Sequence, residues 1–210
     1  MARGVRHCTY CCKPIVGKAT ADHCPPKQLF PAPLPNNLRT VDACEPCNAG
    51  AKIDEDYFRA VLLQTEIADT PAGKRLLAGK AGRGFAKDKG LRATLVRGMQ
   101  WLDATSETGI LLGRQLVIDV ERARLERIAV KIARGLFWLE HGALLPANVG
   151  IFPRFIVGNA LYEAAAPMLP HLRWGKYHWQ AYSTTSMCWL TVAPTQRSGC
   201  FGFMGRPSSL

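Results

Sequence analysis

The chain has 210 residues, of which 48% are apolar and 20% are charged. This composition is typical of a globular protein with one domain, or with a small module joined to a larger one. No apolar run reaches the length of a bilayer-spanning helix, so we expect no membrane-embedded part. The 27 basic and 16 acidic side chains leave a net charge of +11, which favours a polyanionic partner such as nucleic acid over a small substrate.

Two cysteine pairs lie in the first quarter of the chain, and residues 12–43 separate them. Each pair has the two-residue spacing of a zinc knuckle: Cys8-x-x-Cys11 and Cys44-x-x-Cys47. Four thiolates satisfy one tetrahedral zinc ion and leave it no open position for water. The sequence therefore predicts a structural zinc site.

Two local disulfides or a redox motif are the alternatives for these pairs. Disulfides suit a small secreted domain, but residues 1–6 begin no apolar signal sequence, so we expect a cytoplasmic protein of bacterial or phage origin. A redox motif is typically a single pair that opens a helix after a strand. Cys12 and Cys24 have no partner at ligand spacing, and we interpret them as ordinary buried or half-buried thiols.

Between the cysteine pairs, Asp22 and His23 precede a stiff Pro25-Pro26 segment that cannot continue a helix. A histidine in such a strand end or loop can act as a general base near neutral pH. The oxygens of Asp22 and of Asn48, directly after the last cysteine, suit a hard cation such as Mg²⁺. The alternative is that His23 only hydrogen-bonds a backbone carbonyl, that Asp22 caps a turn, and that Asn48 ends the knuckle.

The order of these residues resembles that of the HNH endonucleases, in the form in which Asn replaces the last His. The matching elements are Cys-x-x-Cys, Asp-His-x-x-Pro, Asn-Leu, Cys-x-x-Cys-Asn and then Lys52. The resemblance covers roughly the first quarter of the chain and depends on the combination of motifs. It implies a ββα-metal hairpin and helix, with the four-cysteine zinc behind the active site.

The resemblance also implies a role for each residue. His23 would be the general base that activates water, while Asp22 and Asn48 would hold a catalytic Mg²⁺ or Mn²⁺ ion at the scissile phosphate. Asn37 would brace the loop that carries the histidine, with Asn36 as the alternative. The implied function is a metal-dependent DNA endonuclease, with RNA a less favoured substrate. A zinc module that binds nucleic acid without cutting it, or a structural protein, stays open, and the sequence does not determine the oligomeric state.

After the last cysteine pair, a helix is expected from Asp54 to about Ala68, because acidic residues occupy its first turn. The segment Asp69-Thr70-Pro71 then stops this helix and starts another with Pro71 at its first position. We assign residues 1–68 to the nuclease-like module and residues 69–210 to a basic, helix-rich region that binds DNA or is accessory. Because no polar linker joins them, we expect the module to be built into a larger fold.

Residues 73–97 are the most basic part of the chain, and only Asp88 is acidic there. Several glycines interrupt this segment, which favours short helices or a mobile loop over one long helix. Its cations can follow a phosphate backbone without reading bases; the alternative is a solvated linker. The candidates for nucleic-acid binding are Lys52, Arg83, Lys87, Lys89 and Arg92, and the other cations of the segment are Lys74, Arg75, Lys80 and Arg97.

Residues 110–118 are expected to form a strand or an extended entry into the strongest helical pattern of the chain. That helix is predicted from a cap at Asp119 to His141, ended by Gly142. Four cations lie three and four residues apart on this helix: Arg124, Arg127, Lys131 and Arg134. They either line the path of DNA or form an ordinary solvated face, and we favour the solvated face slightly.

The last third of the chain is rich in aromatic residues, and residues 177–182 and 187–192 have the pattern of strands, with 199–203 as a further candidate. We interpret the aromatic rings as the core of an antiparallel sheet in preference to a base-stacking surface. The predicted fold class is therefore α+β: an N-terminal zinc-stapled ββα module packed on a helical middle and a small C-terminal antiparallel sheet.

Overall fold

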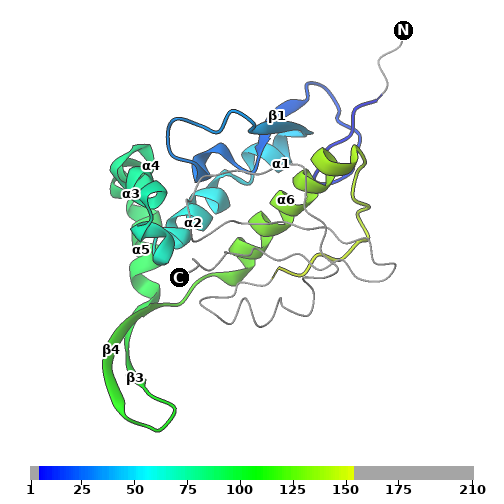
Figure 1. Cartoon of the computed structure of the whole chain (residues 1–210). Coiled ribbons are helices and arrows are strands. Elements are labelled where there is room, and N and C mark those ends of the chain that lie inside the picture. Colours follow the sequence, from blue (N-terminus) through cyan, green and yellow to red (C-terminus); the bar gives the residue numbers. More distant parts are fainter. Residues whose placement is uncertain (1–4, 154–210) are drawn as a thin grey trace, which may run out of the picture.

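The computed structural model describes residues 5–153 of the chain, apart from the side chains of residues 66, 67 and 80. This part is a mixed α+β structure with two separate antiparallel sheets of two strands each (Figure 1). None of the helices within residues 5–153 combines the length and the apolar character needed to cross a membrane. The three strands expected within residues 177–203, like Cys188 and Cys200, lie outside the described residues.

The N-terminal part has the predicted ββα order. Strand β1 (Thr20–Cys24) pairs antiparallel with strand β2 (Arg39–Ala43), and a short 3-10 turn, η1 (Lys27–Leu29), lies in the connection. Helix α1 (Glu45–Ala49) follows directly, and helix α2 (Lys52–Leu62) continues after a break at residues 50–51. Helix α2 thus ends before Ala68, and a separate 3-10 turn, η2 (Glu66–Asp69), completes the segment.

The basic segment forms short helices, as predicted. Helix α3 (Pro71–Ala78) begins with its proline, and the Thr70 side chain accepts a hydrogen bond from the Gly73 backbone N–H at 3.0 Å. Helices α4 (Lys80–Lys87) and α5 (Lys89–Gly98) follow, and Asp88 caps α5 by accepting from the Leu91 N–H at 2.9 Å. These caps satisfy backbone donors that the starts of short helices leave unpaired.

Beyond α5, strand β3 (Met99–Thr105) pairs with strand β4 (Leu111–Ile118) in an antiparallel hairpin. The sequence predicted β4 but not its partner. Figure 1 shows that this hairpin projects away from the helices.

Helix α6 (Arg122–His141) is the long helix that the sequence predicted. It begins two residues later than expected, with Glu121 in place of Asp119 at the cap position. It ends at Gly142, whose φ of 66° is the left-handed conformation that glycine adopts without steric cost.

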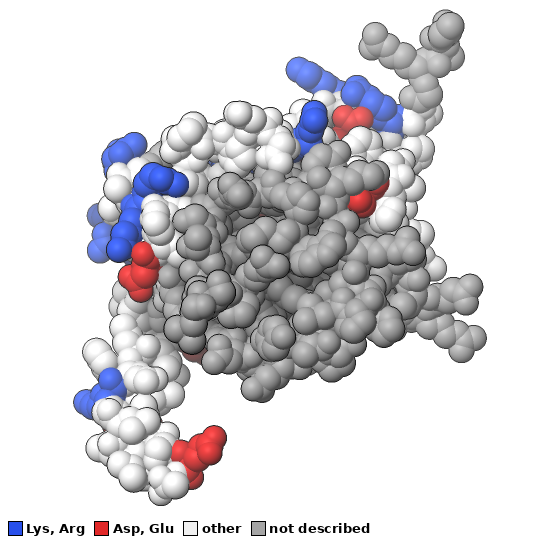
Figure 2. Space-filling model, viewed as in Figure 1, with Lys and Arg blue, Asp and Glu red and all other residues white. Residues whose placement is uncertain are grey.

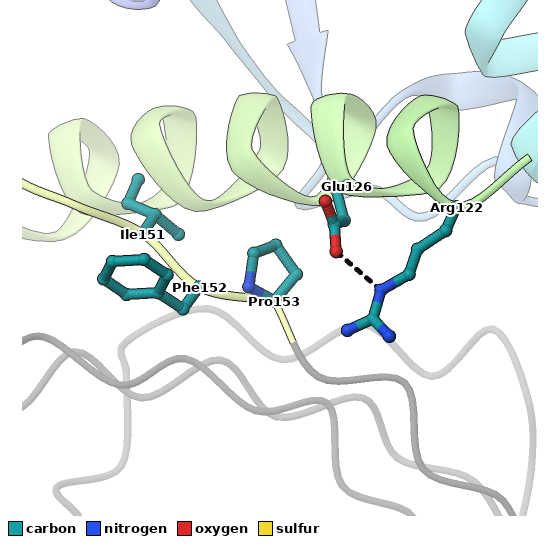
Figure 3. A pocket seen from close by; sticks show the side chains of 5 residues that line it. All are labelled: Arg122, Glu126, Ile151, Phe152 and Pro153. Atoms are coloured by element: carbon teal, nitrogen blue, oxygen red, sulfur yellow. Dashed lines mark hydrogen bonds and ion pairs between the residues drawn. The ribbon is translucent and has the colours of Figure 1, made fainter.

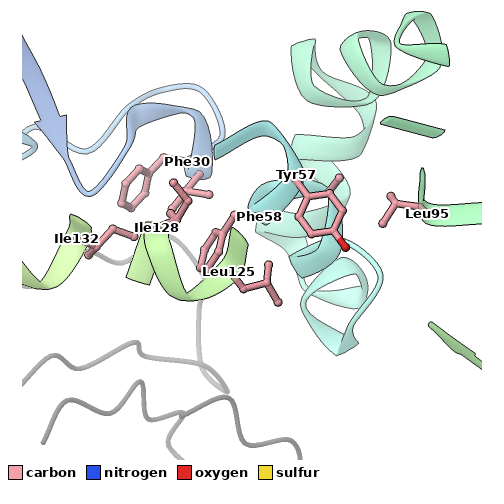
Figure 4. Packing of buried hydrophobic residues seen from close by; sticks show 9 residues of the cluster. Phe30, Tyr57, Phe58, Leu95, Leu125, Ile128 and Ile132 are labelled. Carbon is pink, nitrogen blue, oxygen red and sulfur yellow. The ribbon is translucent and has the colours of Figure 1, made fainter. Parts of the chain in front are cut away.

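The main core joins α6 to elements from both halves of the described chain. Phe30 lies after η1, Phe58 belongs to α2, and both pack with Ile128 and Ile132 of α6 (Figure 4). Leu95 of α5 and residues of α2 extend the same core. The predicted boundary at residue 68 therefore lies between two segments that share one hydrophobic core.

Candidate functional site

The four predicted zinc ligands come together at the start of α1. Cys8 and Cys11 belong to the N-terminal turn, Cys44 is the cap residue of α1, and Cys47 lies within that helix. All four sulfur atoms lie within 4.8 Å of one another, and none of these cysteines forms a disulfide. Tetrahedral zinc with bonds of about 2.3 Å needs sulfur atoms about 3.8 Å apart, and the Sγ atoms of Cys11 and Cys44 are 3.9 Å apart. The donor set therefore fits zinc.

The surroundings of Cys8 favour the thiolate that a metal requires. Burial alone would raise its pKa, but hydrogen bonds from the backbone N–H groups of Cys44, Cys11 and Tyr10 outweigh burial and lower the pKa to about 7. Burial raises the pKa values of Cys11 and Cys47, and for Cys47 the neighbouring sulfur groups add to the effect. Four crowded sulfur groups cannot all be ionised unless a cation offsets their repulsion.

This cluster connects segments that are far apart in the sequence. The turn carrying Cys8 also donates a hydrogen bond from the Thr9 backbone N–H to the Asp42 carbonyl of β2 at 2.9 Å. Cys12 and Cys24 lie outside the cluster, as predicted: Cys24 is buried and Cys12 is half-buried. A metal at the four sulfur atoms would therefore hold the N-terminal turn against the hairpin and the start of α1.

His23 lies in β1, where its register partner is Thr40 of β2. Its side chain is half-buried. Helix α1, which carries the half-buried Asn48, contacts β1, so the structure brings the elements that bear these two side chains side by side. Asn37 is half-buried in the turn before β2, and its neighbour Asn36 is exposed.

Asp22 is oriented differently from His23. Its register partner Val41 is buried in the cluster that packs against α6, whereas Thr40, the partner of His23, is exposed. Because consecutive side chains of a strand point to opposite faces, Asp22 is directed towards α6 and His23 away from it. This differs from the sequence-based expectation that both side chains surround one point.

The Asp22 carboxylate belongs to an ionic network on the α6 side. The Lys131 ammonium group lies 2.7 Å from Asp22 Oδ2 and 2.5 Å from Glu55 Oε1, and the Tyr10 hydroxyl donates to Asp22 Oδ2 at 2.9 Å. Burial alone would lower the pKa of Lys131, but the hydrogen bonds to Asp22 and Glu55 outweigh it and raise the pKa. The cation that meets Asp22 in the structure is therefore Lys131.

The network joins β1, α2, α6 and the cysteine turn. No local pattern predicts it, because its members are far apart in the sequence. The one feature of the sequence that indicated a buried Lys131 was its position, three residues after the core residue Ile128 and next to Ile132. A lysine so close to an apolar helix face has little access to water unless its side chain extends sideways.

The cationic stripe of α6 is not uniformly solvated: the Arg127 side chain is 58% exposed, but the other members of the stripe are more covered. Lys131 and Arg134 are only 7% and 9% exposed, so the interpretation of the stripe as a solvated face is wrong for both. The Arg134 guanidinium donates to the Leu145 carbonyl at 2.8 Å and thereby fixes the segment after α6. The cause is tertiary, because other parts of the chain cover these two side chains.

The other two arginines of the stripe bind α2. The Nε atoms of Arg124 and Arg127 lie 2.7 Å and 2.8 Å from the carboxylate oxygens of Asp54. Burial would raise the pKa of Asp54, but the hydrogen bonds from these arginines outweigh it and lower the pKa. The Arg124 guanidinium also lies over the Tyr57 ring, 4.1 Å from its centroid. These contacts hold α2 against α6.

The described cations of α3–α5 are exposed and make no ion pairs with described residues, unlike most of those on α6. Figure 2 shows basic side chains gathered where Figure 1 places α3 and α4. Seven of these cations are exposed, and none of them makes an ion pair with another residue of the described range. We call them the α3–α5 basic surface: Lys74, Arg75, Arg83, Lys87, Lys89, Arg92 and Arg97. Lys52 is exposed at the start of α2.

A pocket of about 270 Å³ lies beside α6, away from the predicted site residues. Arg122 and Glu126 of α6, which form an ion pair of 2.7 Å, line one side. Ile151, Phe152 and Pro153 line the other (Figure 3). The pocket includes none of the residues proposed for zinc binding, catalysis or nucleic-acid binding.

Comparisons of the chain with protein-family models, with curated proteins and with solved structures returned no match. The assignment of the four-cysteine cluster and of the ββα element therefore depends on the geometry described above.

Proposed function

We propose that the protein is a DNA endonuclease built on a zinc-stapled ββα element, with His23 as the general base. The observation that carries the proposal is the four-cysteine cluster at the junction of the N-terminal turn and α1. Helix α1 follows the β1–β2 hairpin and contacts β1, so the order and packing of these elements match what the HNH resemblance implies. Zinc in this arrangement is structural, because four thiolates complete its coordination.

In the proposed reaction, His23 accepts a proton from a water molecule as the water oxygen attacks the phosphorus atom. A new P–O bond forms, the bond to the leaving ester oxygen breaks, and that oxygen takes up a proton. A divalent cation, when bound, would stabilise the charge that develops on the phosphate and on the leaving oxygen. Asn48 supplies an amide oxygen on the helix beside β1, and Asn37 keeps its predicted role of bracing the loop.

Asp22 fits the divalent site less well than Asn48 does. One of its carboxylate oxygens already receives the Lys131 ammonium group and the Tyr10 hydroxyl. A divalent ion at Asp22 would have to share this carboxylate with Lys131 or displace it. We therefore propose Asn48 as the more accessible ligand and give Asp22 the additional role of anchoring β1 to α6.

The α3–α5 basic surface is the proposed DNA-binding face. Exposed cations without ion-pair partners are available to phosphates, whereas Arg124, Arg127 and Lys131 of α6 are paired with Asp54, Asp22 and Glu55. Neutralising two surface cations in the variant Arg83→Gln/Lys87→Gln should weaken binding uniformly across sequences and reduce the slope of log affinity against log salt by about 2. The control is Arg127→Gln, which alters a cation already paired with a carboxylate.

The test of the catalytic proposal is cleavage of supercoiled plasmid DNA by the zinc-loaded full chain, with Mg²⁺, with Mn²⁺ and with a chelator. His23→Ala should lower the cleavage rate by about 10²- to 10⁴-fold while zinc content and DNA affinity stay unchanged. The matched control is His141→Ala, which removes an exposed imidazole at the end of α6. Equal rates for His23→Ala and the wild type would show that His23 is not the general base.

A second candidate function is nucleic-acid binding without cleavage. The observation in its favour is the ion pair between Asp22 and Lys131, which fills one side of the expected divalent site. It predicts salt-dependent DNA affinity, no cleavage with any divalent ion, and no effect of His23→Ala on either property.

A further inference from the structure

The β3–β4 hairpin exposes an unusual amount of apolar surface for a ribbon that projects from the body. Trp101 is 58% exposed and Leu112 is 68% exposed, and several neighbours have similarly accessible side chains. Solvent-facing hairpins usually carry polar side chains, and a contiguous apolar surface marks an interaction site. The other exposed apolar residues of the hairpin and its tip are Leu102, Ile110, Leu111 and Leu116.

The hairpin is paired from its base to its tip, with one irregularity of register between Ala104 and Thr105. Met99 pairs with Ile118 at the base, the Asp119 N–H donates to the Gly98 carbonyl at 2.8 Å, and Ile118 packs against the main core. At the tip, the Ser106 N–H donates to the Ile110 carbonyl at 2.8 Å. A two-stranded ribbon without a covering layer is only marginally stable in water, so a partner that covers one face would stabilise this hairpin.

The charges of the hairpin disfavour nucleic acid as that partner. Residues 99–118 contain only three charged side chains, Asp103, Glu107 and Arg114. The one cation, Arg114, lies 3.6 Å from Asp103, its register partner across the ribbon. A phosphate backbone would find no free cation here, in contrast to the α3–α5 basic surface, so the observations favour an apolar protein surface.

We propose that the hairpin is a dimerisation arm that packs face to face on the hairpin of a second copy of this chain. One face of the ribbon carries the pair Trp101 and Leu116 next to the pair Asp103 and Arg114. A two-fold axis along the ribbon places Trp101 over Leu116 of the second copy and Asp103 over its Arg114. Apolar side chains thus meet apolar side chains and opposite charges meet, so the face is complementary to itself, as an isologous interface requires. The inference does not depend on the nuclease proposal, but a dimer would supply one ββα element for each strand of a duplex.

The first test is sedimentation velocity of the zinc-loaded full chain over a range of concentrations without DNA. Leu116→Ser should raise the dimer dissociation constant about tenfold or more, whereas Leu102→Ser should leave it unchanged. The two leucines are a matched pair, because each is 48% exposed and they lie on opposite faces of the ribbon. Thermal unfolding of both variants checks that each remains folded.

The second test uses charge reversal and mixing. Asp103→Arg and Arg114→Asp each place like charges together in a homodimer, so each variant alone should be monomeric. Mixing the two variants should restore dimers, because every opposed pair is then of opposite sign. An effect confined to one hairpin cannot produce recovery on mixing.

A wild-type chain that stays monomeric at all concentrations would overturn the proposal. It would also be overturned if Leu116→Ser lowers DNA affinity and leaves the oligomeric state unchanged, because the hairpin would then contact nucleic acid.

Discussion

Replacing Lys131 with methionine removes the cation that two carboxylates share while keeping most of the volume of the side chain. The ammonium group lies 2.7 Å from Asp22 and 2.5 Å from Glu55, and the three side chains are 8%, 12% and 12% exposed. Removing one partner of a buried ion pair typically costs about 3–5 kcal/mol, because the remaining charge is left uncompensated. We expect a loss near the lower end of this range, because the Tyr10 hydroxyl and the Gln28 amide still donate to the two carboxylates.

The assay is urea unfolding of the zinc-loaded protein, followed by far-ultraviolet circular dichroism. Arg127→Met is the matched control, because Arg127 is a cation of the same helix whose side chain is 58% exposed. An exposed pair of this kind is worth about 0–1 kcal/mol. The triple variant Lys131→Met/Asp22→Asn/Glu55→Gln should recover most of the lost stability, since it leaves no buried charge without a partner. If Lys131→Met costs no more than Arg127→Met at pH 7, the ionic network does not hold the hairpin to α6.

Three further outcomes follow from the described contacts. Cys44→Ser should abolish stoichiometric zinc, measured by elemental analysis, and unfold the N-terminal hairpin, whereas Cys12→Ser should retain the metal; equal zinc content in both would refute the ligand assignment. Asp54→Asn should lower stability at neutral pH and lose this effect as the pH falls through the lowered pKa of the folded carboxyl group, because the stability from a depressed pKa exists only above it; a difference from wild type that persists at the most acidic pH would contradict this. Gly135→Ala should destabilise the fold by about 1–3 kcal/mol, because an added Cβ would lie 2.3 Å from the Cys24 sulfur, and Cys24→Ala in the same chain should restore part of the loss in thermal unfolding.

Features that depend on neighbouring residues could be predicted from the amino-acid sequence. The cysteine spacing predicted the metal cluster, Thr70 and Pro71 predicted the start of α3, and Gly142 predicted the end of α6. Glycines within residues 73–97 predicted short helices. In each case the deciding contacts lie within a few residues, so the local pattern contains the necessary information.

The partners of the ionisable side chains could not be predicted from local patterns, because they depend on how distant segments pack. Lys131 and Arg134 lie on what looked like a solvated stripe, yet both are buried: Lys131 meets Asp22 and Glu55, and Arg134 meets Cys12 and the segment after α6. The direction of Asp22 depends on the register of β1 with β2 and on the position of α6, and the exposed face of β4 depends on its pairing with β3. Helical or strand periodicity fixes which side chains share a face, but it does not say what covers that face. Long-range packing decides which segment covers a face. Where that segment buries a carboxylate, a cation from another element has to compensate its charge.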